Sequence, residues 1–162
     1  RNTGRLIMNE EDATRFSGSE SDRKRLLELH RQYLDSNLTL DTEALRGVWS
    51  GNPDCVFFNG NGHTYHGLAH WTKLWDFYRD QVKTAEPWRS TDVRLTGGGD
   101  MALLTCERTC KVDWTGEGAA ADFTGKVWKT RSTEVYVREN GDWRCVHLHI
   151  STAAEGPRPG GI

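Results

Sequence analysis

The sequence has little of what membrane proteins or nucleic-acid-binding proteins need. Its longest apolar runs, Cys55–Phe58 and Met101–Leu104, fall far short of the roughly 20 residues that span a bilayer. Basic and acidic residues nearly cancel, because 21 Lys and Arg stand against 23 Asp and Glu, a formal charge of −2. Nucleic-acid binding relies on a clustered basic excess that is missing here. We therefore expect neither a membrane nor a nucleic acid as partner.

Cysteine is also scarce. The 162 residues hold four cysteines, at positions 55, 106, 110 and 145, and no two of them form a Cys-x-x-Cys pair. That is too few for a disulfide scaffold in a chain of this length. Reduced thiols and a cytoplasmic protein are the expectation. No signal peptide opens the sequence, although a start at Arg1 rather than methionine is compatible with a removed leader.

Tryptophan, in contrast, is plentiful. Seven residues are Trp, whereas only two are Met. Such rings fill hydrophobic cores, and they also line small-molecule pockets. The length suits one domain with a single core. We expect most of the tryptophans to be packed in that core and several to wall a cavity or a dimer face.

The spacing of apolar residues predicts helices in the first half of the chain and strands in the second. Leucines and aromatic residues at helical intervals predict three helices, over 22–38, 42–49 and 68–82. Strands are predicted over six segments: 54–59, 63–67, 89–95, 101–114, 123–138 and 143–152.

This order of elements predicts an α+β fold in a single domain. A cone-shaped, curved antiparallel sheet would wrap around three N-terminal helices, with a cavity between its concave face and the first helix. The domain is expected over 22–152. Residues 1–21 are expected to form a flexible arm and 153–162 a flexible tail.

The last strand carries an unusual polar stripe. Because side chains alternate along a strand, Trp143, Cys145, His147, His149 and Ser151 should share one face. Two imidazoles and a hydroxyl in one row are uncommon in the body of a sheet. The row either supplies a functional site or satisfies its hydrogen bonds at a dimer interface or core edge.

The residues that face this row depend on the turn at Asn140-Gly141. A two-residue turn would place Ser132 opposite His149, whereas a three-residue loop with Gly141 in a bulge would place Arg131 there. We favour the second register, since it gathers the polar side chains of both strands on one face.

The end of the chain resembles a known superfamily. Arg131-Ser132-Thr133, Asn140–Trp143 and His147–Ser151 give an R-x-T, N-G-x-W and H-x-H-x-S pattern after three helices and a meander. This resembles the nuclear-transport-factor-two-like superfamily, in its SnoaL-like and ketosteroid-isomerase-like branch. Residues 140–151 also resemble the end of the calcium/calmodulin-dependent kinase II association domain. The resemblance covers about 22–151 and implies the cone fold, which hosts isomerases, cyclases, dehydratases, hydrolases and oligomerisation modules.

The resemblance also implies a polar pocket built from this hairpin. Arg131 would hold a carboxylate, and His149 would move a proton near neutral pH. Glu107 on the neighbouring strand would orient the histidine or act as a base, unless it only forms a cross-strand ion pair with Arg131. Six more residues are expected to contact the substrate: His147, Thr133, Ser151, Tyr65, His63 and Trp128.

These observations predict a small-molecule-binding protein. We expect cofactor-free acid/base chemistry, as in an isomerase, dehydratase or cyclase, on a carbonyl or anionic carboxylate compound. The alternative is a non-catalytic module that forms a homodimer or larger homo-oligomer and keeps a metabolite pocket. A metal-independent carbonic anhydrase is a lesser alternative, because those enzymes have adjacent histidines where His147 and His149 are separated. No metal is expected, since no acidic third ligand accompanies His66 and His70.

Overall fold

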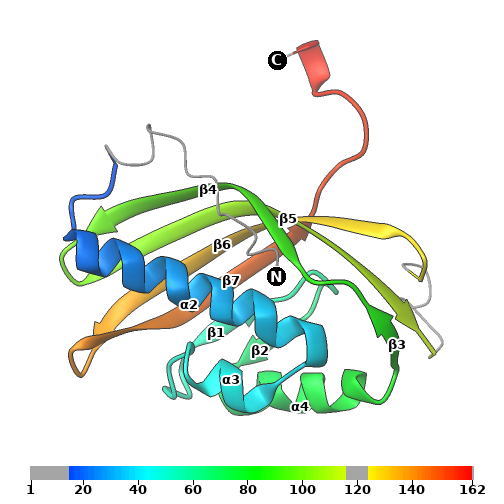
Figure 1. The fold of residues 1–162 in the computed structure, drawn as a ribbon, viewed down its shortest axis with the longest axis horizontal. Coiled ribbons are helices and arrows are strands. Elements are labelled where there is room, and N and C mark those ends of the chain that lie inside the picture. The colour runs from blue at the N-terminus through cyan, green and yellow to red at the C-terminus, as the bar shows by residue number, and fades with distance from the viewer. Residues whose placement is uncertain (1–14, 116–123, 162) are drawn as a thin grey trace, which may run out of the picture.

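The computed structural model describes residues 15–115 and 124–161, in which helices lie across one face of a strongly curved sheet (Figure 1). Three α-helices form in this part of the chain: α2 (Glu20–Thr39), α3 (Thr42–Arg46) and α4 (Gly67–Arg79). The strands are β1 (Val56–Phe58), β2 (Thr64–His66), β3 (Val82–Ala85), β4 (Arg89–Gly98), β5 (Met101–Trp114), β6 (Val127–Glu139) and β7 (Asp142–Thr152). A single 3₁₀ turn, η2 (Pro159–Gly161), follows. The predicted α+β cone is confirmed.

The long helix α2 starts at a capping box. The Ser19 hydroxyl accepts the backbone N–H of Asp22 at 3.0 Å, and the Asp22 carboxylate accepts that of Ser19 at 3.3 Å. Phe16, before the helix, is 5% exposed and packs in the core. The expected flexible arm therefore does not extend to Phe16, and residues 1–14 lie outside the described chain.

The sheet is mixed rather than wholly antiparallel. Its strands run in the order β2-β1-β7-β6-β5-β3, and β4 also pairs with β5. All neighbouring pairs are antiparallel except β1 and β7, which are parallel. The predicted strand over 101–114 is confirmed as β5. We did not predict β3, and the beginning of the strand expected from 123 lies outside the described residues.

The hairpin between β6 and β7 turns on two residues and then bulges. Asn140 and Gly141 both have positive φ, 50° and 83°, and Arg138 pairs with Trp143. The three-residue loop that we favoured is therefore wrong. Val146 is then an extra residue, because the next two pairs are Tyr136 with Cys145 and Val135 with His147.

This bulge divides the polar stripe of β7 between two faces of the sheet. Trp143 and Cys145 are each 1% exposed on the helix-covered face. Beyond Val146 the alternation is shifted by one residue, so His149 is exposed while Leu148 is buried. The prediction that all five residues of the stripe share one face is therefore wrong.

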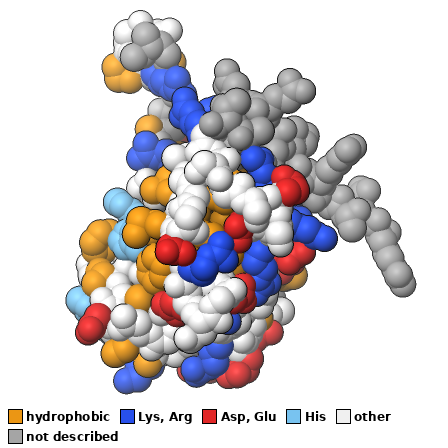
Figure 2. Space-filling model, turned by 90° about the vertical axis from the view of Figure 1, so that its left-hand side faces the viewer, with side chains coloured by type: hydrophobic (Ala, Val, Ile, Leu, Met, Phe, Trp, Pro, Cys, Tyr) orange, Lys and Arg blue, Asp and Glu red, His pale blue; other side chains and the backbone are white. Residues whose placement is uncertain are grey.

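The first turns of α2 are tied to this hairpin by charged hydrogen bonds. The Asp22 carboxylate accepts from Trp143 Nε1 at 2.9 Å and from Arg138 at 2.7 Å, and both bonds lower the pKa of Asp22. Arg25 donates two hydrogen bonds to Asp142, at 2.9 and 2.8 Å, which likewise lowers the pKa of that carboxyl group. Basic and acidic side chains alternate on this end of the molecule (Figure 2). The helix is thereby fixed over the concave face.

Candidate functional site

The three residues predicted to be catalytic lie on the outer face of the sheet. Glu107 pairs with Arg131 across β5 and β6, and both are exposed, as is His149. Arg131 donates a hydrogen bond to Ser151 Oγ at 3.1 Å. The helices cover the opposite face, where Arg108 is buried. The expectation that Glu107, Arg131 and His149 line the cavity is therefore wrong, because strand alternation and the Val146 bulge turn them outward.

Two more of the expected substrate-binding residues share this outer face with Ser151. The His147 Nδ1–H donates to the carbonyl of Val56 at 2.6 Å, so this ring fastens β7 to β1. Thr133 lies opposite His149 and is half-buried. The structure thus brings these polar residues together as predicted, but outside the cone.

The other three expected contacts lie elsewhere. Trp128 lines the cavity described below. Tyr65 is buried beneath the β1–β2 turn, and its hydroxyl accepts a hydrogen bond from Asn61 at 2.8 Å. His63, in the same turn, is exposed. Trp128 is therefore the one expected substrate contact among the residues that line this cavity.

A cavity of about 120 Å³ lies between α2, α4 and the concave face of the sheet. An apolar cavity of roughly 150 Å³ holds a benzene molecule, so this one suits a single ring. Most of its wall is apolar, from Leu38, Leu74, Val112 and Ile150 among others. Five of the seven tryptophans also line it: Trp71, Trp75, Trp88, Trp114 and Trp128.

Arg108 is the one charged residue among the described residues that line this cavity. Its side chain is 1% exposed. Its Nη1 donates to the Tyr33 hydroxyl at 3.2 Å, and its guanidinium lies 4.9 Å from the centre of the Trp88 ring. In the described chain its Nε has no hydrogen-bond partner, and no carboxylate lies within ion-pair distance of it. Burial alone would lower the pKa of Arg108, but Tyr33, Cys106 and the charge of Glu134 raise it. A buried cation without an acidic partner is costly, and it marks a place for an anion.

Tyr33 supplies a second polar group beside Arg108. Burial raises the pKa of Tyr33, so its hydroxyl remains a neutral phenol. The oxygen accepts from Arg108, which leaves the hydroxyl hydrogen available for another acceptor. The two residues therefore present hydrogen-bond donors at the same end of the cavity.

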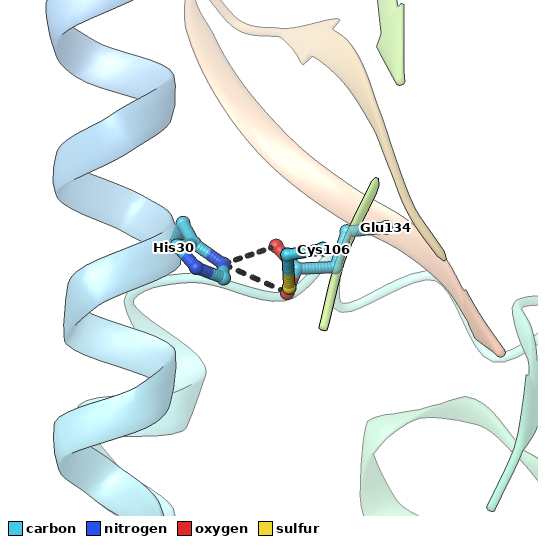
Figure 3. A group of neighbouring side chains, drawn as sticks. All are labelled: His30, Cys106 and Glu134. Atoms are coloured by element: carbon cyan, nitrogen blue, oxygen red, sulfur yellow. Dashed lines mark hydrogen bonds and ion pairs between the residues drawn. The ribbon is translucent and has the colours of Figure 1, made fainter. Parts of the chain in front are cut away.

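A buried polar cluster lies one helical turn before Tyr33 (Figure 3). His30 on α2 places Nδ1 at 2.9 and 3.0 Å from the two carboxylate oxygens of Glu134 on β6. Its Nε2 lies 3.1 Å from Ser90 Oγ on β4. The Tyr136 hydroxyl donates to Glu134 at 2.6 Å. The cluster joins the helix to three strands of the sheet through Ser90, Glu134 and Cys106.

The charges of this cluster stabilise each other. Burial is the largest single effect and would lower the pKa of His30, but the charge and hydrogen bonds of Glu134, together with Cys106, outweigh it and raise the pKa to about 10. Burial is also the largest effect on Glu134 and would raise its pKa, but the charge and hydrogen bond of His30, with Tyr136 and Arg108, together lower it below its usual value. The resting state is therefore an imidazolium–carboxylate pair.

The same cluster contains three side chains that are typical metal ligands. One donor atom each from His30, Cys106 and Glu134 lies within 4.8 Å of the other two. However, both imidazole nitrogens and both carboxylate oxygens have hydrogen-bond partners, and Cys106 Sγ lies 3.3 Å from Ser132 Oγ. Hydrogen bonds alone thus satisfy the cluster.

Sequence reasoning missed Arg108, His30 and Glu134. The signal for Arg108 was present, because it lies between Cys106 and Cys110 on the buried face of a strand whose bounds were predicted. His30 likewise lies on the apolar face of the predicted first helix, next to Leu29. A lone charge on a buried face was the sign to look for.

Three comparisons place the chain among known proteins. The family model of the SnoaL-like domain matches residues 26–155. An NTF2-like superfamily protein from Salmonella enterica serovar Typhimurium is 15% identical, with a TM-score of 0.72 over 88% of this chain and 98% of that one. LinA is 15% identical, with a TM-score of 0.70 over 94% and 96%. An NTF2-like protein of unknown function from Pseudomonas putida is 18% identical, with a TM-score of 0.69 over 86% of this chain and 92% of that one. No curated protein matches.

Proposed function

The chain belongs to the SnoaL-like domain family, and we propose that its cavity binds a small, largely apolar molecule with one carboxylate or carbonyl oxygen and performs cofactor-free acid/base chemistry on it. The observation that carries this proposal is Arg108, a buried guanidinium without a carboxylate partner at the end of an aromatic cavity. Isomerases and dehydratases occur among proteins of this fold.

Charge balance favours an anionic ligand. In the described part of the concave interior, Arg108 and protonated His30 each carry a positive charge, and Glu134 carries the only negative charge near them. The interior therefore has one positive charge in excess. A monoanion placed at Arg108 would neutralise it and accept the free Nε–H, which repays part of the desolvation cost.

The same donors suit a carbonyl compound whose oxygen becomes negative during reaction. Arg108 and the Tyr33 hydroxyl would stabilise an enolate oxygen in a water-poor site, where such hydrogen bonds are strong. The tryptophan rings would hold the apolar body of the ligand and exclude water. Arg108 would thus take the carboxylate-binding role that the sequence suggested for Arg131.

We expect the protein to bind phenylacetate at least about 10-fold more tightly than its neutral counterpart phenylacetamide, a difference of roughly 1.4 kcal/mol. Both molecules have one ring, but only the first brings a negative charge to Arg108. Quenching of tryptophan fluorescence, checked by calorimetry, would give both dissociation constants, since five tryptophans line the cavity. Equal affinities, or binding of neither molecule, would contradict the proposal.

A homodimer formed through the outer sheet face is a second proposal, in keeping with the association-module alternative. Three large apolar side chains are exposed there: Phe58 at 39%, Met101 at 59% and Leu103 at 36%. Phe58 adjoins the outward-facing histidines, since its ring contacts those of His147 and His149, whereas Met101 and Leu103 lie two strands away from these histidines, on β5. Histidine and hydrophobic side chains gather along this side of the molecule, at the left of Figure 2. Such a patch is typical of an association surface.

The substitution Leu103→Asp is expected to convert the dimer to a monomer, because it puts a charge into the centre of that surface. Sedimentation velocity at micromolar concentration would measure the change. Phe77→Asp on α4 is the matched control: Phe77 is 65% exposed but lies away from the sheet, so this variant should stay dimeric. A wild-type protein that is monomeric would rule out this assembly.

Cysteine chemistry supports a reducing compartment. All four cysteines are buried and free. Within the described ranges no helix is long and apolar enough to cross a membrane. We propose that the protein acts in the cytoplasm, as the scarcity of cysteine suggested.

A further inference from the structure

The hydrogen-bonded relay of half-buried Ser90 with buried His30 and Glu134 has no part in the ligand binding just proposed, although it adjoins the binding end of the cavity. Ser90 stands directly opposite Arg108 in the β4–β5 ladder, so their side chains are neighbours on the concave face. Trp88, two residues before Ser90, lines the cavity and stacks on Arg108. Tyr33, one turn after His30, lines the cavity as well. The relay therefore lies next to the groups that would hold the ligand oxygen.

In its resting state the relay holds a transferable proton on His30. Protonated His30 donates Nδ1–H to Glu134 and Nε2–H to Ser90 Oγ, so both ring hydrogens are bonded. The other titratable groups around it are Cys106 and Arg108 on β5, and Tyr136 behind Glu134. Glu134 supplies the charge that keeps the imidazole protonated at neutral pH.

Ser90 makes the stored proton transferable. A hydroxyl group both donates and accepts hydrogen bonds, so Ser90 can accept from imidazolium and donate to neutral imidazole. His30 can therefore change charge while Nδ1–H stays on Glu134 and no buried polar atom loses its partner. A backbone carbonyl in the position of Ser90 would satisfy only the protonated form.

We propose that Ser90 donates its hydroxyl proton to the ligand oxygen held at Arg108, and that His30 replaces this proton from its Nε2. The relay would thus act as the general acid of the cavity. The proposal rests on the proposed function. One proton moves at each step: Ser90 O–H to ligand oxygen, then His30 Nε2–H to Ser90. His30 becomes neutral and keeps its bond to Glu134. Because Ser90 is only half-buried, we expect its hydroxyl to exchange with water, through which the proton returns once the ligand leaves.

From this relay we expect the protein to catalyse the enolisation of a one-ring ketone. In D₂O the wild-type protein should speed deuterium incorporation next to the carbonyl of phenylacetone, with water taking the carbon-bound proton. Ser90→Ala should slow this rate about 100-fold, the usual effect of losing a general acid, while phenylacetone still binds. The wild-type rate should fall as pH rises through about 10, where His30 loses its proton, and Ser90→Ala should lack that fall. Proton NMR would follow both.

Ser132→Ala is the matched control. It likewise removes one serine hydroxyl on the inner face of the sheet, but Ser132 is bonded to Cys106 and not to His30, so its rate should stay within about twofold of wild type. Ser90→Thr, which keeps the hydroxyl, should retain most of the rate. Equal rates in Ser90→Ala and Ser132→Ala would overturn the proposal. A wild-type protein that binds phenylacetate but does not catalyse deuterium incorporation into phenylacetone would overturn the relay proposal alone. A protein that binds neither compound would overturn the proposed function too.

Discussion

Glu134→Ala is expected to lower the free energy of unfolding by about 3–5 kcal/mol, the usual cost of removing one partner from a buried ion pair. The substitution leaves His30 buried with no counter-charge, since His30 has no measurable exposure. It also removes the acceptor of the Tyr136 hydroxyl. Urea denaturation at neutral pH would measure the loss as a lower midpoint with an unchanged m-value.

The double substitution His30→Leu with Glu134→Leu separates the charge effect from simple loss of packing. Replacing both members of a buried pair by apolar residues is often neutral, so this variant should recover most of the stability that Glu134→Ala loses. The two results together would show that the pair is costly to break but gives little net stability. A loss below about 0.5 kcal/mol in Glu134→Ala, the size of an ordinary surface effect, would show that the pair is not buried as described.

Arg108→Met is expected to change ligand affinity and stability in opposite directions. It removes the cation that would pair with a carboxylate, so phenylacetate should bind about 2–5 kcal/mol more weakly, a loss of roughly 30- to 5,000-fold. The same change ends the burial of an unpaired charge. The free energy of unfolding should therefore stay the same or rise by up to about 2 kcal/mol. Calorimetric titration and urea denaturation of the same preparation would test both effects.

The neutral ligand provides the internal control for Arg108→Met. Phenylacetamide carries no charge, so its affinity should change much less than that of phenylacetate, and the preference for the anion should disappear. Arg108→Lys keeps a charge but loses the planar guanidinium over Trp88, and it should bind phenylacetate with intermediate affinity. A large fall in stability with unchanged affinity would show that Arg108 is structural.

Much of the fold could be predicted because its periodic signals are long. The apolar spacing of the first helix predicted 22–38, and the structure has Glu20–Thr39. Strand β5 has the predicted bounds, and every second residue is buried from Ala102 to Cys110. The short strand β3 was missed because four residues next to a helix end give no period. The parallel pairing of β1 with β7 joins segments far apart in sequence, which no local pattern encodes.

The site was harder to predict for a different reason. A strand pattern gives two faces but does not say which of them the helices cover, and the histidine row made the outer face look functional. Arg108 shares its face of the strand with two cysteines, which behave as small apolar residues, so the inward face looked like plain core. The pairing of His30 with Glu134 links residues more than a hundred positions apart, and only the folded chain reveals it.

The extra residue Val146 acts on β7 as a frameshift acts on a reading frame. Before it, Trp143 and Cys145 project into the cone, and after it, odd-numbered residues such as His149 project outward. Adding or deleting one residue at this point would exchange the lining of the interior for the surface over half of the strand. Aligned positions beyond Val146 therefore correspond between relatives only when both chains carry the bulge.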